Sequence, residues 1–128
     1  MSNREFGDQV RQLTAGLLRK ELWVVHATTI GNSADLVPHL QEHLAYMLGL
    51  EEQGKVLAGG PFLHLDGSNS GNGMFILRAA DEAEARKLMA GDPLNRPTLR
   101  RYELSRWQMN IGRMDISLML SRQAVVMK

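Results

Sequence analysis

The sequence contains no cysteine among its 128 residues. Disulfides, thiolate nucleophiles and cysteine-based zinc or iron–sulfur sites are therefore excluded. It also lacks any apolar run of membrane-spanning length. The first residues, MSNREFGDQVRQ, are polar, which is not typical of a signal peptide. From these absences we expect a cytoplasmic protein with no membrane partner.

Neither sign of charge is in excess, because 15 basic residues stand against 14 acidic ones and the net charge is +1. A nucleic-acid-binding domain usually carries a clustered basic face, so we expect no nucleic-acid partner. The densest basic cluster falls in and before the last expected strand, where we interpret it as a solvated strand face. It consists of Arg96, Arg100, Arg101 and Arg106.

What is present is typical of one soluble globular domain, with 44% hydrophobic and 23% charged residues. Hydrophobic periodicity predicts helices over 3–19, 34–53 and 81–90, and strands over 21–30, 55–66, 74–79 and 98–109. The stretch 113–128 has no clear period. We expect a single domain spanning 1–128.

Caps and breakers support the expected helices. Ser33 or Asp35 is the expected N-cap of the helix over 34–53, and Gly54 is placed to end it in a left-handed conformation. Asp81 is the expected N-cap of the following helix, with Glu84 as its capping-box partner. The segment Gly59-Gly60-Pro61 predicts a bulge or bend in the second strand, because proline cannot donate to a ladder.

The resulting order is β-α-β-β-α-β, preceded by an extra N-terminal helix and followed by a C-terminal tail. This order predicts an α+β fold of the ferredoxin-like split βαβ type. Its helices cover one face of the sheet, yet the strands are apolar on both faces: Val25 alternates with Val24, and Phe75 with Ile76. An apolar second face requires a partner, and the simplest is a second copy of the chain.

Two histidines, His39 and His43, lie four residues apart on the expected helix over 34–53. This spacing suits two metal ligands, but no HExxH motif is present, so we expect no metal. His43 falls on the edge of the apolar stripe, where a half-buried imidazole needs a hydrogen-bond partner. A neighbouring carboxylate would suit this need, and Asp92, in the loop after the next helix, is geometrically plausible because both helices of a split βαβ lie on the same sheet face. The pair is either catalytic or a structural tie between two helices.

Three segments together resemble the YciI-related family of the dimeric α/β-barrel superfamily. They are HLAYMLGLEEQGKVLAGGPF, GNGMFILRAADEAEARKLMAGDPL and YELSRWQMNIG. The specific features are His43, Gly60-Pro61 and Asp92-Pro93, in that order. The resemblance covers a core at about 22–112. It implies a ferredoxin-like protomer, a homodimer or higher oligomer forming a dimeric α/β barrel, and His43 and Asp92 as the active-site pair.

The resemblance implies a small enzyme that needs no cofactor. The sequence has no nucleophile-elbow serine, so proton transfer by His43 and Asp92 is the expected chemistry. Isomerase, lyase or dehalogenase activity on a small organic or aromatic-pathway acid fits this expectation. The expected apolar wall for such a ligand comprises Tyr46, Pro61, Phe62 and Trp107, although each is alternatively a simple core residue. The alternative function is a non-catalytic small-ligand-binding or stress-related module.

Overall fold

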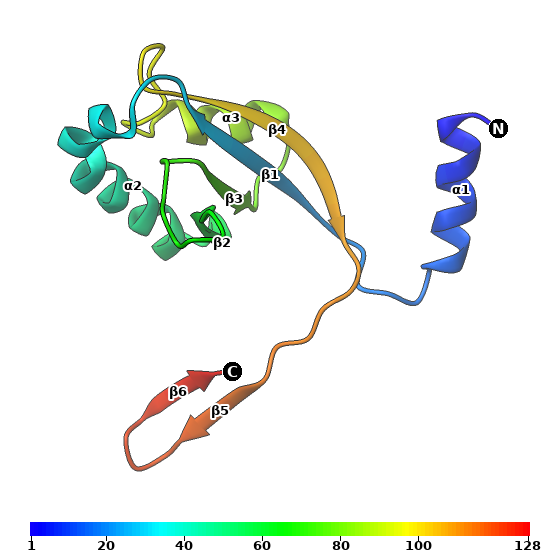
Figure 1. Ribbon diagram of the computed structural model, residues 1–128. Coiled ribbons are helices and arrows are strands. Elements are labelled where there is room, and N and C mark those ends of the chain that lie inside the picture. Colours follow the sequence, from blue (N-terminus) through cyan, green and yellow to red (C-terminus); the bar gives the residue numbers. More distant parts are fainter. The chain divides into compact units, whose positions relative to one another are not determined.

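Four strands form the sheet that carries the core. Their bounds are Lys20–Thr29 (β1), Val56–Pro61 (β2), Gly73–Leu77 (β3) and Arg100–Met109 (β4). The strand order is β2-β3-β1-β4, and β3 pairs antiparallel with both β1 and β2. Figure 1 shows β1 and β4 side by side. β2 and β3, which follow each other in the chain, therefore form a hairpin.

The structure, a computed structural model, describes residues 1–128 as two units. One unit is Glu21–Trp107, which holds the sheet, and the other combines Met1–Lys20 with Gln108–Lys128. The predicted single domain over 1–128 stays a prediction. The predicted α+β class is confirmed.

The irregularity in β2 lies earlier than predicted. The register with β3 shifts between Val56 and Ala58, whereas Gly59, Gly60 and Pro61 continue the ladder. Pro61 is tolerated because β2 is an edge strand. Such a strand has a neighbour on one side only, so a proline without an N–H can be accommodated.

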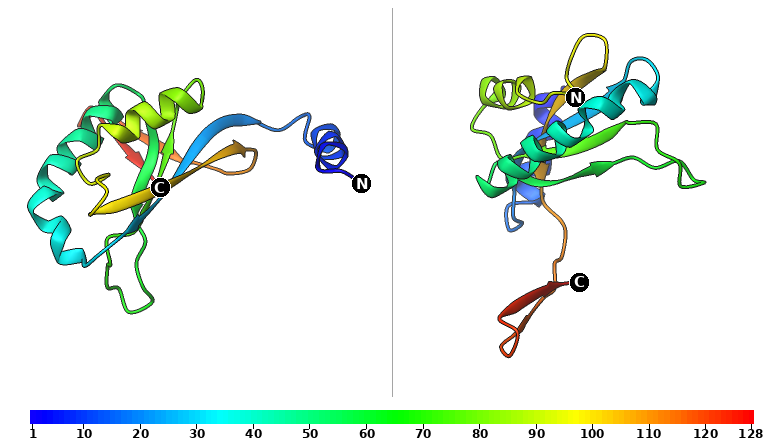
Figure 2. Two further views of the ribbon diagram at one scale, coloured as in Figure 1. Left: turned by 90° about the horizontal axis from the view of Figure 1, so that it is seen from above. Right: turned by 90° about the vertical axis from the view of Figure 1, so that its left-hand side faces the viewer.

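One face of the sheet is buried against two helices, α2 (Leu40–Glu52) and α3 (Glu82–Ala90). Both helices lie over the same face (Figure 2). Alternation along the strands turns one set of side chains toward them. The buried cluster between sheet and helices comprises Val25, Met47, Leu50, Phe75, Leu77, Ala85 and Met89.

The helix predicted over 34–53 is divided in two. Its first part, Ser33–His39 (η1), is a 3₁₀ helix that contains Pro38, and only Leu40–Glu52 is α-helical. The predicted N-caps, Ser33 and Asp35, are wrong, because Asn32 caps η1 by accepting from the Ala34 N–H at 2.9 Å. Asp35 instead completes the capping box by accepting from the Asn32 N–H.

The end of α2 follows the prediction. Gly54 has φ of +76°, a left-handed conformation that glycine adopts without steric cost. The Lys55 N–H donates to the Leu50 carbonyl at 2.8 Å, and the Gly54 N–H donates to the Glu51 carbonyl at 2.9 Å. These two bonds form a Schellman motif, which satisfies the last carbonyls of the helix.

The start of α3 is capped by both predicted residues, but not as a reciprocal box. The Asp81 carboxylate accepts from the Glu84 N–H at 2.8 Å. The Glu84 carboxylate accepts from the Ala80 N–H at 2.7 Å and from Lys55 Nζ at 2.7 Å. Glu84 therefore connects α3 to Lys55, the residue immediately before β2.

The terminal unit contains one helix and one hairpin. The helix α1 spans Asn3–Leu13 and has no buried residue. The prediction to residue 19 was too long, because Thr14 caps the helix and its hydroxyl donates to the Val10 carbonyl. The hairpin pairs β5 (Ile116–Met119) with β6 (Ala124–Met127). No helix anywhere in the chain has both the length and the apolar character that crossing a membrane requires.

Candidate functional site

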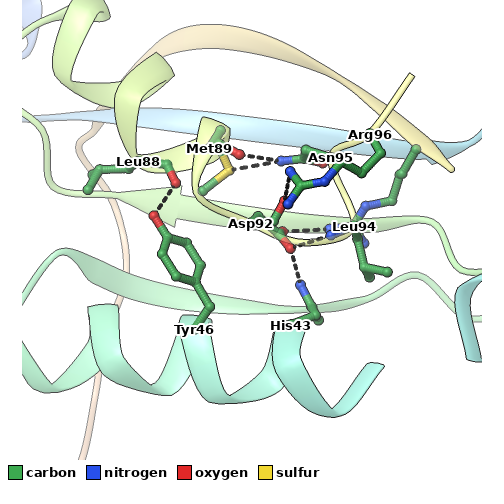
Figure 3. Close-up of polar contacts among 9 residues, drawn as sticks. His43, Tyr46, Leu88, Met89, Asp92, Leu94, Asn95 and Arg96 are labelled. Atoms are coloured by element: carbon green, nitrogen blue, oxygen red, sulfur yellow. Dashed lines mark hydrogen bonds and ion pairs between the residues drawn. The ribbon is translucent and has the colours of Figure 1, made fainter. Parts of the chain in front are cut away.

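The candidate site is centred on Asp92, a carboxylate with 0% exposure in the loop that follows α3. Its Oδ1 lies 2.7 Å from His43 Nδ1 and accepts from the Leu94 N–H at 2.9 Å. Its Oδ2 accepts from Arg100 Nη2 at 3.0 Å. Figure 3 shows how α2 and the loop after α3 bring His43 and Asp92 together.

The position of His43 follows from its place on α2. The residue lies at the edge of the buried stripe, and only 14% of its side chain is exposed. Because Asp92 accepts as a carboxylate, Nδ1 must carry the proton of the neutral ring. The other ring nitrogen, Nε2, has no hydrogen-bond partner in the protein and is not among the fully buried, unpartnered polar atoms. His43 therefore keeps a free nitrogen for a ligand or for water.

Arg100 is a part of the site that the sequence analysis missed. The interpretation of the arginine cluster as a solvated strand face is wrong for this residue, which has only 5% exposure. The burial follows from the alternation of side chains along β4. Arg100 points to the same face of the sheet as Tyr102 and Leu104, which pack against the buried core. Arg101 and Arg106 are exposed, as expected. The missed signal was this alternation.

Burial and the neighbouring Asp92 shift the pKa of Arg100 in opposite directions. Desolvation lowers the pKa of the Arg100 guanidinium, because a charge is less favourable away from water. Asp92 acts in the opposite direction, by its negative charge and by its hydrogen bond. A buried pair of this kind is stable only when both partners are present.

Phe75, on β3, forms the apolar floor under both basic groups. Its ring centroid lies 5.8 Å from that of His43 and 5.8 Å from Cζ of Arg100, which is within the range of a cation–π contact. The neighbouring position on β2 favours glycine, because a Cβ at Gly59 would lie 2.5 Å from Cδ1 of Phe75 unless the ring shifted.

A cavity of about 390 Å³ opens beside this cluster. His43 and Arg100 both line it, and so does Phe75. The size falls within the range of small-molecule sites, which combine apolar walls with a few polar groups. Part of the wall comes from α2 residues that were expected to pack inward and are instead about half exposed along the cavity, namely Leu40, Leu44 and Leu48.

The residues expected to bind a ligand are not all brought together. Pro61 lines the cavity. Phe62 lines a smaller cavity of about 270 Å³ with Met74 and Ile76, and its ring lies 5.1 Å from that of His26. Trp107 is 39% exposed and lines neither cavity.

Tyr46 also does not line the cavity. Its hydroxyl donates to the Leu88 carbonyl, which ties α2 to α3 (Figure 3). Burial, and secondly the negative charge of Asp92, raises the pKa of the Tyr46 hydroxyl above its ordinary value. This contact is structural, and it holds the helix that carries His43.

No group of three or more metal-ligating side chains occurs in the structure. No third metal-ligating side chain therefore lies close enough to complete a site with His39 and His43. His43 Nδ1 is already hydrogen-bonded to Asp92.

Fold and site together define an α+β protein in which a buried aspartate–arginine pair and a partly exposed histidine border an apolar cavity. Residues 22–108 match the family described as the YCII-related domain. This match covers more than half of the chain, and the chain belongs to that family. A comparison with curated proteins found no match.

Proposed function

We propose that this chain is a small, cofactor-independent enzyme in which His43 and Asp92 transfer a proton on a small organic or aromatic-pathway acid. The reaction class is isomerase, lyase or dehalogenase. The observation that carries this proposal is the hydrogen bond of 2.7 Å between His43 Nδ1 and Asp92 Oδ1, which leaves Nε2 free beside a cavity.

The proposed steps need only this chain's own residues. His43 Nε2 takes a proton from an acidic C–H or O–H of the bound acid, and the ring becomes an imidazolium. Asp92 holds the ring in one orientation and stabilises the positive charge. The ring then returns the proton to another atom of the ligand, or to a leaving group.

The proposed protomer is ferredoxin-like, and the proposed assembly is a homodimer of the dimeric α/β-barrel type. The strand order β2-β3-β1-β4, with one helical connection after β1 and one after β3, supports the first proposal. The apolar residues on the sheet face opposite the helices support the second.

The test detects proton transfer without knowledge of the product. Candidate 2-oxo, 3-oxo and phenolic acids are incubated with the protein in D₂O, and ¹H NMR follows exchange of their acidic C–H positions. We expect catalysed exchange for at least one acid. His43→Ala should slow it by about 10²–10⁴-fold, the usual contribution of general acid–base catalysis.

His39→Ala is the matched control, because it removes the same ring one helical turn earlier and should leave the exchange rate unchanged. Full exchange activity in His43→Ala would overturn the proposal. Specific binding of an acid with no exchange or turnover would favour the non-catalytic ligand-binding module instead.

A further inference from the structure

Arg100 has a polar atom that the protein does not satisfy. Its side chain is only 4% exposed, and Nη2 donates to Asp92. Nε is fully buried and has no hydrogen-bond partner. A guanidinium carries five N–H donors in one plane, so pairing with Asp92 leaves most of its donor capacity unused.

A buried donor without an acceptor is unfavourable, and proteins rarely retain one without a reason. Arg100 lines the cavity that His43 also lines. The neighbouring aromatic face of Phe75 offers no hydrogen-bond acceptor of ordinary strength, although it contacts the guanidinium carbon at 5.8 Å. Nη1 also has no hydrogen-bond partner in the protein, and it is not among the fully buried, unpartnered atoms. A molecule in the cavity could therefore supply an acceptor to Nη1.

We propose that Arg100 is the anion-binding residue of this cavity, and that the ligand class is a small monocarboxylate with an apolar body. This inference rests on the proposed function and names its substrate class. A carboxylate matches a guanidinium because both are planar, and such hydrogen bonds are charge-assisted. The ligand then lies with its charged end at Arg100, next to the free nitrogen of His43.

The walls of the cavity favour one carboxylate rather than two. Leu36, Met47 and Leu94 provide apolar lining. Glu51 also lines the cavity, and it follows His43 by eight residues on α2, about 12 Å along the helix axis. A second carboxylate at that distance would meet the negative charge of Glu51. A monocarboxylate places only its apolar body there.

The experiment compares benzoate with benzamide, a neutral molecule of nearly the same shape. Binding to the full chain is measured by NMR titration, and the arginine Nε–H resonances are followed at the same time. We expect benzoate to bind about tenfold or more tightly than benzamide, because a hydrogen bond to a charged group contributes that much. The Arg100 Nε–H resonance should shift on binding.

Arg100→Lys keeps the positive charge next to Asp92 and removes the Nη1 donor and the planar guanidinium, so it should lose most of the preference for benzoate. Arg101→Lys is the matched control, because Arg101 is the next residue on β4 and is exposed. It should keep the preference. If Arg100→Lys does not fold, the Nε–H shift in the unchanged protein remains as a readout.

Equal binding of benzoate and benzamide, or an unshifted Arg100 Nε–H resonance, would overturn this inference. The proposed function is tested separately by His43→Ala. This variant should still prefer benzoate while it loses proton exchange. If His43→Ala loses exchange but the natural protein binds benzoate and benzamide equally, the proposed function is supported and only the inference about Arg100 is contradicted.

Discussion

Asp92 is the residue on which the site depends, because one buried carboxylate accepts hydrogen bonds from His43, Leu94 and Arg100. Two of these donors are side chains from different elements, α2 and β4. Asp92 therefore both orients the imidazole and compensates the buried charge of Arg100. Its structural and proposed catalytic roles come from the same two oxygen atoms.

We predict that Asp92→Asn is destabilised by about 3–5 kcal/mol, because it leaves the buried Arg100 guanidinium without a negative partner. Chemical denaturation measures this difference. Asp115→Asn is the control, since Asp115 pairs with Arg113 at an exposed position, and its stability should change by no more than about 0.5 kcal/mol. Equal stabilities of the two variants would show that the buried pair contributes little.

The sequence predicted part of this cluster and missed part of it. His43 was identified by its place at the stripe edge, and Asp92 by the family resemblance. Arg100 was missed because a charged residue is usually exposed. Its contact with Asp92, which compensates the buried charge, forms only in the folded chain. Tyr46 and Trp107 do not line the cavity, and the sequence could not show this because it does not fix the direction in which an aromatic side chain points.

At the scale of the elements, the close contact of β2 with β3 shapes the cavity. Gly59 pairs with Phe75 in the ladder, and the absence of a side chain lets the ring lie against the β2 backbone. The ring is then held beneath His43 and Arg100. The edge strand β2 therefore contributes to the site because Gly59 has no side chain and leaves room for the Phe75 ring.

We predict that Gly59→Ala is destabilised by about 1–3 kcal/mol, as is typical of overpacking, since its Cβ would lie 2.5 Å from the Phe75 ring. Gly60→Ala is the matched control, because a Cβ there meets nothing within 4 Å, and it should be neutral or slightly stabilising. Thermal unfolding of both variants makes the comparison. A Gly59→Ala protein as stable as Gly60→Ala would contradict the role of this close contact.

The contact between α3 and Lys55 should depend on pH through Glu84. Hydrogen bonds from Lys55, and then from the Ala80 N–H, lower the pKa of Glu84 from its ordinary value of 4.5. A lowered folded-state pKa means that the stabilisation is fully present above pH 4.5 and is lost as the pH falls through the lowered value.

Glu84→Gln should therefore be less stable than the natural protein at neutral pH, and the difference should shrink on acidification. Urea unfolding at a series of pH values measures it. Glu82→Gln, which affects an exposed pair with Arg86, should show a smaller difference throughout. A Glu84→Gln difference that stays constant down to strongly acidic pH would contradict the role of the charge.

Element types were largely predictable, whereas element ends and irregularities were not. Periodicity located β1, β3 and α3 because their buried residues alternate or recur at helical spacing. It did not separate η1 from α2, since residues three positions apart lie near the same face in both helix types and η1 is only seven residues long. The β5–β6 hairpin was missed because its residues show no clear alternation of polar and apolar side chains.

At the scale of the whole molecule, β1 and β3 carry apolar residues on the sheet face opposite the helices. Val24 and Ile76 pair on it across β1 and β3, and the cavity lined by Met74 and Phe62 adjoins Ile76. We predict a homodimer at micromolar concentration that buries this face. Sedimentation measures the assembly.

Ile76→Glu should convert the dimer to a monomer, because it places a charge in the predicted interface. Val37→Glu is the control, since Val37 is 63% exposed on η1, and the variant should remain dimeric. A stable, well-folded monomer of the natural chain at micromolar concentration would contradict the prediction.

The central claim is that Asp92 holds His43 with Nε2 free for proton transfer, and the tautomer of His43 tests it most directly. ¹⁵N NMR of the histidine-labelled protein, at a pH where the ring is neutral, distinguishes protonated from unprotonated ring nitrogens. The account predicts a proton on Nδ1 and none on Nε2. A His43 ring that carries its proton on Nε2 would contradict it.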